Sequence, residues 1–211
     1  SYPPSTGAFN PAITETYIRP ILEFLSEIGS PFMINAYPFF AYKENSNTVS
    51  LQYVLFESNP GVVDDNTGIR YYNMFDAMLD AVHSAIAALG YQNLSILVSE
   101  TGWPSGGDST EIGANPENAQ LYHNNLFKHL LSNPGTPLRP NATIDVYLFA
   151  LFNENLKTGA KSENHFGLFK PDGSKVYSFN FSTSSSTSIH WYPEASWWIM
   201  KALCMILACF L

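Results

Sequence analysis

The chain has 211 residues, of which 45% are hydrophobic, 13% charged and 15% aromatic, a composition that describes a globular protein with one core, or part of a larger one. The formal net charge of -8 and the pI near 5.0 exclude nucleic acid as a partner, because no basic patch is available to neutralise phosphates. An uncharged substrate fits better, and the aromatic surplus suits a groove that stacks sugar rings or, equally, a core rich in rings.

The first half of the chain begins with a predicted helix over residues 11–28, which Gly29 ends. Its apolar residues at helical spacing are Ile13, Tyr17, Ile21, Phe24, Leu25 and Ile28. A short apolar strand follows from Pro31 and ends in a Tyr-Pro turn. Residues 48–56 alternate in a way that predicts a hairpin strand or an insertion.

The second half repeats this alternation of helix and strand. A long helix is predicted over residues 70–90, with Gly90 at its end, and the strand "SILVSE" follows at 95–100. A third helix starts near Pro116, and the last strand is predicted over 143–154. Helices that alternate with strands in this order predict parallel strands joined by crossover helices.

The three predicted strands are continuous apolar runs, which predicts that both of their faces are covered. Polar and aromatic residues stand at their C-terminal ends, the edge where a (β/α)₈ barrel or an open doubly wound sheet builds its sites. These residues are Asn35, Tyr37, Glu100, Trp103, Asn153 and Glu154. No Gly-rich phosphate loop follows any of the strands, which disfavours nucleotide binding.

Glu100 runs directly out of an apolar strand into a Gly-Trp-Pro turn. A carboxylate in such a place must be paired, protonated or used, or else it caps the next turn through backbone N–H groups. If the strands of Glu100 and Glu154 are neighbours, they lie about 4.8 Å apart. Retaining glycosidases hold two carboxyl groups about 5 to 5.5 Å apart among aromatic rings, so this pair favours glycoside hydrolysis. Lys157 and Glu163 either shift the pKa values of their neighbours or form a solvated loop pair.

The competing chemistries lack their motifs. The five histidines show no ligand spacing beside a strand-end carboxylate, which predicts surface histidines and no metal site. The absence of a G-x-S-x-G elbow disfavours a Ser-His-Asp hydrolase. Both cysteines, Cys204 and Cys209, lie in the last eight residues, so the main body has neither a disulfide nor a cysteine-based metal site. No cofactor is implied, and no protein partner can be inferred.

Four segments of the chain resemble one known family. The segment "ILVSETGWPSGG" resembles the signature of the plant β-1,3-glucanases of glycoside hydrolase family 17. Three further segments resemble the same family in the same order: "FMINAYPFFAY", "GIRYYNMFDAMLDAVHSAI" and "FALFNENLKTG…FGLFKPDGS". This resemblance covers roughly residues 1–181. It implies a (β/α)₈ TIM barrel and retaining endo-hydrolysis of internal β-1,3 linkages in a β-1,3-glucan such as callose or fungal wall glucan.

The resemblance also implies roles for single residues. Glu100 stands at the position of the family's nucleophile, and Glu154, Lys157 and Glu163 stand where the family has a charge network that supports the site. The residues expected to bind substrate are Asn35, Tyr37, Phe40, Trp103, Asn153 and Phe166, among which Tyr37 and Phe40 match aromatic positions of the sugar-binding cleft. This assignment conflicts with the geometric one, in which Glu154 would be the acid, and we expect Glu154 to support the site rather than to protonate.

The family's general acid/base lies in an Asn-Glu pair that ends an earlier strand. We therefore expect this group upstream and absent from this chain, which would hold only the C-terminal portion of the barrel, about three of its eight strands. Two hypotheses follow. The chain is either a part of an active endo-1,3-β-glucanase or a truncated protein that binds β-1,3-glucan without cleaving it. An upstream strand ending in Asn-Glu would favour the enzyme.

The expected domain boundaries place the C-terminal part of the catalytic barrel at 1–181, a Ser/Thr-rich linker at 182–196 and a hydrophobic tail at 197–211. The tail is shorter than the roughly 20 residues that a spanning helix needs. It resembles a GPI-attachment signal, which would anchor the protein at the plasma membrane, or else it is a divergent or misread terminus.

Three N-x-[ST] sequons are compatible with passage through a secretory pathway. They lie at Asn93, Asn141 and Asn180. Together with the resemblance, they favour a secreted protein of the extracellular space or cell wall, with the vacuole as an alternative.

Overall fold

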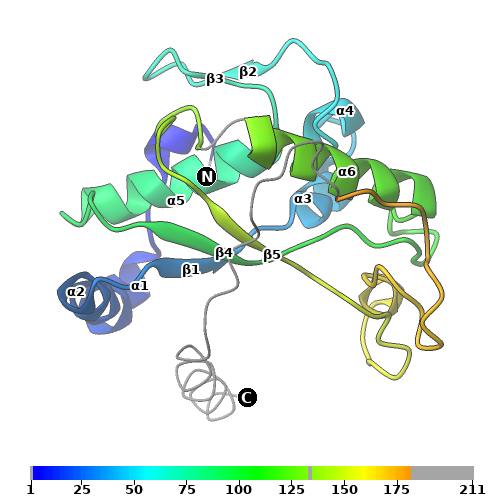
Figure 1. The fold of residues 1–211 in the computed structure, drawn as a ribbon. Coiled ribbons are helices and arrows are strands. Elements are labelled where there is room, and N and C mark those ends of the chain that lie inside the picture. Colours follow the sequence, from blue (N-terminus) through cyan, green and yellow to red (C-terminus); the bar gives the residue numbers. More distant parts are fainter. Residues whose placement is uncertain (1, 133–134, 182–211) are drawn as a thin grey trace. The chain divides into compact units, whose positions relative to one another are not determined.

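The computed structural model describes residues 2–132 and 135–181, so the linker and tail expected at 182–196 and 197–211 lie outside the described residues. The fold described below is that of the unit Ser1–Asn180 (Figure 1). Its helices and strands, in chain order, are η1 (Pro4–Thr6), α1 (Pro11–Ile13), the π-helix η2 (Thr14–Ile18), α2 (Arg19–Ile28), β1 (Phe32–Asn35), α3 (Pro38–Asn45), α4 (Leu51–Val54), β2 (Val62–Val63), β3 (Arg70–Tyr71), α5 (Met74–Ala88), β4 (Ile96–Thr101), α6 (Pro116–Ser132), β5 (Asp145–Leu148) and η3 (Lys161–Asn164).

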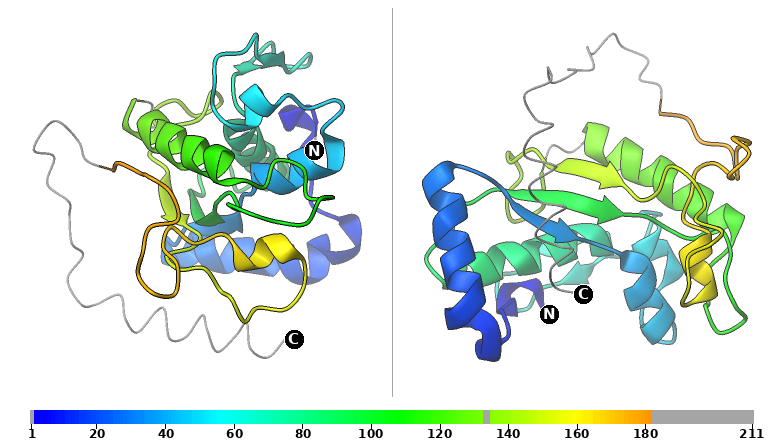
Figure 2. Two further views of the ribbon diagram at one scale, coloured as in Figure 1. Left: turned by 90° about the vertical axis from the view of Figure 1, so that its right-hand side faces the viewer. Right: turned by 90° about the horizontal axis from the view of Figure 1, so that it is seen from below.

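Three parallel strands form the main sheet in the order β1-β4-β5. Helix α5 connects β1 to β4, and α6 connects β4 to β5. The predicted parallel strands with crossover helices are therefore confirmed. Figures 1 and 2 show α5 and α6 on the same side of the sheet, so the two crossovers return along one face. This arrangement brings the C-terminal ends of all three strands to one edge.

A hydrophobic core lies between α2, α5 and the sheet. Its buried residues are Leu22, Ile86, Leu94 and Ile96. On α5, Phe75, Leu79 and Ile86 are fully buried, and their spacing of four and seven residues places them on one helical face. Asn73 begins α5 by accepting a hydrogen bond from the backbone N–H of Asp76, which satisfies one of the free donors of the first turn.

The helix predicted over residues 11–28 exists, but most of its periodic apolar side chains do not face the core. Among the predicted members, Leu25 is half-buried and the others are exposed, namely Ile13, Tyr17, Ile21, Phe24 and Ile28. The fully buried residue of the helix is Leu22, which the prediction did not include. Helix α2 therefore carries a second apolar stripe that the described residues do not cover, and periodicity alone does not say which of the two stripes is buried. Gly29 ends α2 in the left-handed conformation, as predicted.

The expectation that the strands are covered on both faces is wrong for β1 and β5 among residues 2–132 and 135–181. Both strands alternate between exposed and half-buried residues. Met33 and Tyr147 are exposed on the open face, whereas Val98 of the central strand β4 is fully buried. The reason is that α2 and α5 pack against the Phe32 and Ile34 side of the sheet.

Two local predictions are also corrected. Residues 48–56 contain no strand but the short helix α4, which Ser50 caps by accepting a hydrogen bond from the Tyr53 N–H, and which buries Tyr53 and Val54. The hairpin lies further on, where β2 and β3 pair antiparallel. The last strand is shorter than predicted, because β5 ends at Leu148. No helix in the described part of the chain is long and apolar enough to cross a membrane.

Candidate active site

Glu100 and Tyr37 meet at the C-terminal edge of the sheet. Asn35, the last residue of β1, lies opposite Glu100 of β4 in the parallel register, and the Ala36 N–H donates to the Glu100 carbonyl at 2.9 Å. The chain then turns so that the Tyr37 hydroxyl donates to Oε2 of Glu100 at 2.9 Å. Burial, and then the hydrogen bond to Glu100, raises the pKa of Tyr37, so the phenol remains a neutral donor.

A pocket of about 180 Å³ opens beside Glu100. Its lining residues are Tyr37, Phe40, Glu100, Phe149, Lys157, Glu163 and Phe166. The ring of Tyr37 lies 5.4 Å from the ring of Phe40 and 5.6 Å from that of Phe166, and Phe149 packs 5.7 Å from Phe166. The pocket thus combines a carboxylate with aromatic walls, which is the combination that sugar rings require.

A charge network also lines this pocket. The Lys157 ammonium lies 2.9 Å from Oε2 of Glu163 and 3.4 Å from Oε2 of Glu154, and 5.0 Å above the Phe149 ring. The hydrogen bond to Glu163 raises the pKa of Lys157, so the cation persists at neutral pH. Glu100, Lys157 and Glu163 thus line the same pocket, in which two carboxylates accompany one ammonium.

The comparison with known proteins decides the family. The model of the glycosyl hydrolases family 17 matches residues 1–181. The chain belongs to this family. Family 17 membership and the solved structures related to it imply the (β/α)₈ fold of glycosidases, to which the described residues contribute a parallel three-stranded sheet and its helices.

Several curated relatives of this chain are plant proteins. Glucan endo-1,3-beta-glucosidase 14 of Arabidopsis thaliana is 55% identical over 84% of this chain and 45% of the relative. Glucan endo-1,3-beta-D-glucosidase of Olea europaea is 53% identical over 84% of this chain and 38% of the relative. The solved structure of CJP38, a beta-1,3-glucanase and allergen of Cryptomeria japonica pollen, matches with a TM-score of 0.79 and 52% identity, over 86% of this chain and 55% of that one. The chain spans less than half the length of the two curated relatives.

Six of the ten site residues proposed from the sequence line the pocket, and Glu154 contacts it through Lys157. The remaining three are held elsewhere. The amide oxygen of Asn35 accepts a hydrogen bond from the Ser99 hydroxyl at 2.8 Å, and that of Asn153 accepts from the Gly167 N–H at 2.9 Å. Trp103 is fully buried, and its indole N–H donates to the Gly113 carbonyl at 2.9 Å. Trp103 therefore acts on this family 17 site only through the residues packed around it.

Phe149 is the pocket residue that the sequence did not single out. It directly follows β5 and reads as one more apolar residue of a strand. The apolar run continues beyond Leu148, so the sequence does not mark the point at which β5 ends and Phe149 reaches the C-terminal edge. Glu154, six residues beyond the end of β5, is nearly half exposed and is not among the pocket residues. This placement suits a supporting carboxylate.

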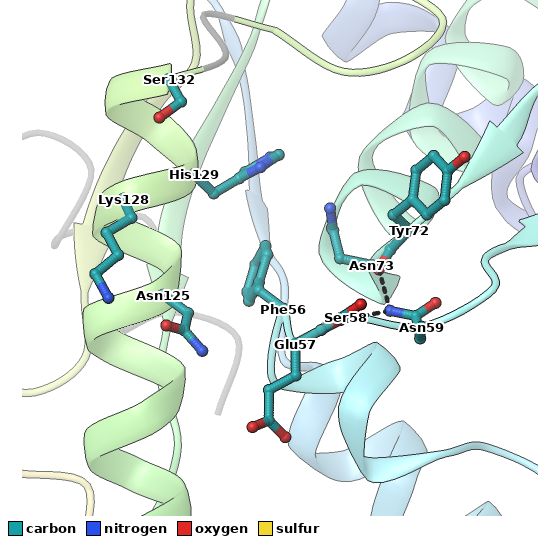
Figure 3. Close-up of a pocket in the computed structure, with 10 residues that line it drawn as sticks. All are labelled: Phe56, Glu57, Ser58, Asn59, Tyr72, Asn73, Asn125, Lys128, His129 and Ser132. Carbon is teal, nitrogen blue, oxygen red and sulfur yellow. Dashed lines mark hydrogen bonds between the residues drawn. The ribbon is translucent and has the colours of Figure 1, made fainter.

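A larger pocket, of about 450 Å³, lies between α6 and the segments that flank the small hairpin (Figure 3). It contains none of the site residues proposed from the sequence. Three of its amides are engaged within the protein: Asn59 donates to the carbonyls of Glu57 and Tyr72, Asn125 donates to the Leu55 carbonyl, and Asn73 caps α5. These three amides are thus used for local structure of the protein.

The prediction of surface histidines is wrong for two of the four that the structure describes, and His190 lies outside the described residues. His83 and His123 are buried, and burial lowers the pKa of each to about 4. Each lies on the inner face of a helix, α5 or α6, where a neutral imidazole packs as an aromatic ring. Within the described residues, no group of three or more histidine, cysteine, aspartate or glutamate side chains could hold a metal ion.

Proposed function

We propose that this family 17 chain serves the retaining endo-hydrolysis of internal 1,3-β-glucosidic linkages in β-1,3-glucan, with Glu100 as the nucleophile. The observation that carries the proposal is the Glu100 carboxylate, held by the Tyr37 hydroxyl and open to a pocket with aromatic walls and a Lys157–Glu163 ion pair. The names of the relatives, glucan endo-1,3-beta-glucosidases, support the choice of linkage.

In the proposed reaction, a carboxylate oxygen of Glu100 attacks the anomeric carbon of a glucosyl unit and forms a glycosyl ester, while a carboxylic acid protonates the departing oxygen. Water then hydrolyses the ester. Tyr37 orients the carboxylate before attack, and Phe40, Phe149 and Phe166 bound the space for the sugar. Glu154, Lys157 and Glu163 supply the surrounding negative field. The proton donor is expected in the part of the relatives that this chain does not span.

The same proposal covers the architecture and the location. Residues 1–181 would supply the last three strands of a (β/α)₈ barrel and the site at their C-terminal edge, followed by the linker at 182–196 and the tail at 197–211. The protein would act outside the cell, at the wall, or in the vacuole, where a β-1,3-glucan is met. Anchoring through a GPI signal in the tail remains part of this proposal.

The test is the release of fluoride from the glycosyl fluoride of a β-1,3-linked glucose disaccharide by the purified 211-residue chain, because fluoride leaves without a proton donor. Glu100→Gln is the variant, and the glycosyl fluoride of the β-1,4-linked disaccharide is the substrate control. We expect about one fluoride or more per folded chain from the β-1,3-linked compound only, and its loss in the variant. Release that Glu100→Gln does not change would overturn the assignment of the nucleophile. A folded chain that binds β-1,3-glucan and releases no fluoride would overturn catalysis by this chain and favour a glucan-binding role.

A further inference from the structure

A buried carboxylate outside the pocket joins two of the loops that form it. Glu111 lies in the loop between β4 and α6 and is only 7% exposed. Its Oε2 accepts hydrogen bonds from the backbone N–H of Asp108 at 3.0 Å and from that of Ser162 at 2.9 Å, and its Oε1 accepts the Ser162 hydroxyl. Burial alone would raise the pKa of Glu111, but these hydrogen bonds and Lys43 lower it, so the carboxylate is ionised.

The third loop of the site approaches the same carboxylate. Lys43 of α3, which follows β1, places its ammonium 4.0 Å from Oε1 of Glu111. The same ammonium lies 5.5 Å from the ring centre of Phe40, which lines the pocket. The segments that follow β1, β4 and β5 therefore meet at one buried negative charge. Of the three residues that contact the Glu111 carboxylate, Ser162 and Lys43 are distant in sequence and only Asp108 is local. The carboxylate therefore does more than stabilise its own turn.

The part of the β5 loop that Glu111 holds is the part that carries the charge network. Ser162 is fully buried within η3 and directly precedes Glu163, whose carboxylate binds Lys157. A second contact between the two loops, from Ser105 to the His165 carbonyl, holds the far end of η3. Of these contacts between the two loops, those of Glu111 are made at Ser162, one residue before Glu163.

We propose that Glu111 is a positioning residue, whose buried carboxylate ties the loops after β1, β4 and β5 together and thereby sets the place of Glu163 and Lys157 in the pocket. The charge of Glu111 strengthens the two backbone hydrogen bonds at Oε2 and attracts the Lys43 ammonium. A glutamine keeps an oxygen for the two N–H groups and can donate to the Ser162 hydroxyl, but it removes this charge. The effect of Glu111 on glucan binding rests on the proposed function, whereas its effect on the order of the loop after β5 does not.

The test compares Glu111→Gln and Ser162→Ala with Glu27→Gln, which removes an exposed glutamate of α2, in the full 211-residue chain. Amide hydrogen exchange is followed in residues 155–165 and in α5, and the affinity for a β-1,3-linked glucose hexasaccharide is measured by calorimetry. For Glu111→Gln we expect exchange in 155–165 to accelerate about tenfold or more and the affinity to fall about tenfold, with α5 unchanged. Ser162→Ala should show a smaller effect in the same segment, and Glu27→Gln no effect.

The outcomes separate the two proposals. Unchanged exchange in residues 155–165 would overturn the positioning role, and so would an equal acceleration in α5, since that would reveal a general loss of stability. If Glu111→Gln does not fold, Ser162→Ala decides alone, because it keeps the backbone contact and loses only the hydroxyl. Should neither wild type nor variant bind the hexasaccharide while the exchange of 155–165 differs, the positioning role stands and the proposed function fails.

Discussion

The Tyr37 hydroxyl donates a hydrogen bond of 2.9 Å to the Glu100 carboxylate across 63 residues of sequence. The contact exists because β1 and β4 are parallel neighbours whose C-terminal ends coincide. A charge-assisted hydrogen bond fixes the direction of the carboxylate before substrate arrives. The proposed nucleophile is therefore held by a residue whose ring also forms a wall of the pocket.

Tyr37→Phe should slow the attack by Glu100 about tenfold or more, because the carboxylate loses the contact that holds it in the direction of attack. The rate is measured as inactivation by an activated 2-deoxy-2-fluoro glycosyl fluoride of β-1,3-linked glucose. Tyr147→Phe is the matched control, since Tyr147 is 60% exposed on the open face of the sheet. An inactivation rate in Tyr37→Phe equal to that of the control would show that the hydrogen bond has no part in the attack.

Phe149→Ala should weaken the binding of a β-1,3-linked oligosaccharide by roughly three- to tenfold, because an aromatic contact contributes about 0.5–1.5 kcal/mol beyond its buried area. Phe149 lines the pocket, whereas Phe152, three residues later, packs on Phe169 and is not among the pocket residues. Phe152→Ala therefore serves as the control in the calorimetric titration. Equal losses for the two variants would exclude a direct contact of Phe149 with sugar.

Asp80 and His83 lie one turn apart in α5, and protonation shifts stability in opposite directions at the two residues. Burial raises the pKa of Asp80 to about 6 from 3.8, so its contribution is present below pH 3.8 and is lost as the pH rises through 6. Burial lowers the pKa of His83 to about 4 from 6.5, so its contribution is present above pH 6.5 and is lost as the pH falls through 4. The two effects therefore oppose each other between about pH 4 and pH 6.

Asp80→Asn should leave the pH dependence of stability that comes from His83 without the opposing effect of Asp80. The amide oxygen can still accept the hydrogen bond that the Leu138 N–H donates to Asp80 at 2.9 Å. Between pH 6.5 and 4, the free energy of unfolding in urea should fall more steeply in Asp80→Asn than in the wild type, and less steeply in His83→Gln. Parallel pH profiles for all three proteins would contradict the assigned protonation states.

The two apolar stripes of α2 should differ in their effect on stability. Leu22→Ala should cost about 2 to 5 kcal/mol of unfolding free energy, because Leu22 is fully buried in the core. Phe24→Ser should change it by no more than about 0.5 kcal/mol, because Phe24 is 57% exposed. Urea unfolding of both variants checks this pair. A loss from Phe24→Ser as large as that from Leu22→Ala would mean that something covers the second stripe in solution.

The sequence predicted the parts of this site that depend on local patterns. Glu100 and Tyr37 at strand ends and the crossover helices follow from periodicity and turn residues over short stretches, whereas Phe40 was expected only from the resemblance to family 17. Strand ends are recognisable in this way because the residues that stop a strand stand next to it in sequence. The family signature around Glu100 lies in the same short stretch.

The parts that the sequence did not predict depend on contacts between distant segments. To predict the hydrogen bond between Tyr37 and Glu100, one must know the register of β1 against β4. To predict the burial of Asp80 and His83, one must know which face of α5 packs against its neighbours. The tie between Glu111 and Ser162 spans 51 residues and has no local pattern at all. Trp103 was expected to bind substrate from its place after a strand and from the family resemblance, but it is fully buried and packs against Phe39 and Tyr122.

The central claim is that Glu100 is the nucleophile, and covalent labelling tests it most directly. In a 2-deoxy-2-fluoro glycosyl fluoride of β-1,3-linked glucose, the C1–F bond breaks, fluoride leaves without a proton donor, and C1 forms an ester with the attacking carboxylate. The account predicts one adduct per folded chain, mapped by mass spectrometry to the peptide with Glu100 and absent in Glu100→Gln. An adduct on Glu154 or Glu163, or no adduct on a folded chain that binds the reagent, would contradict it.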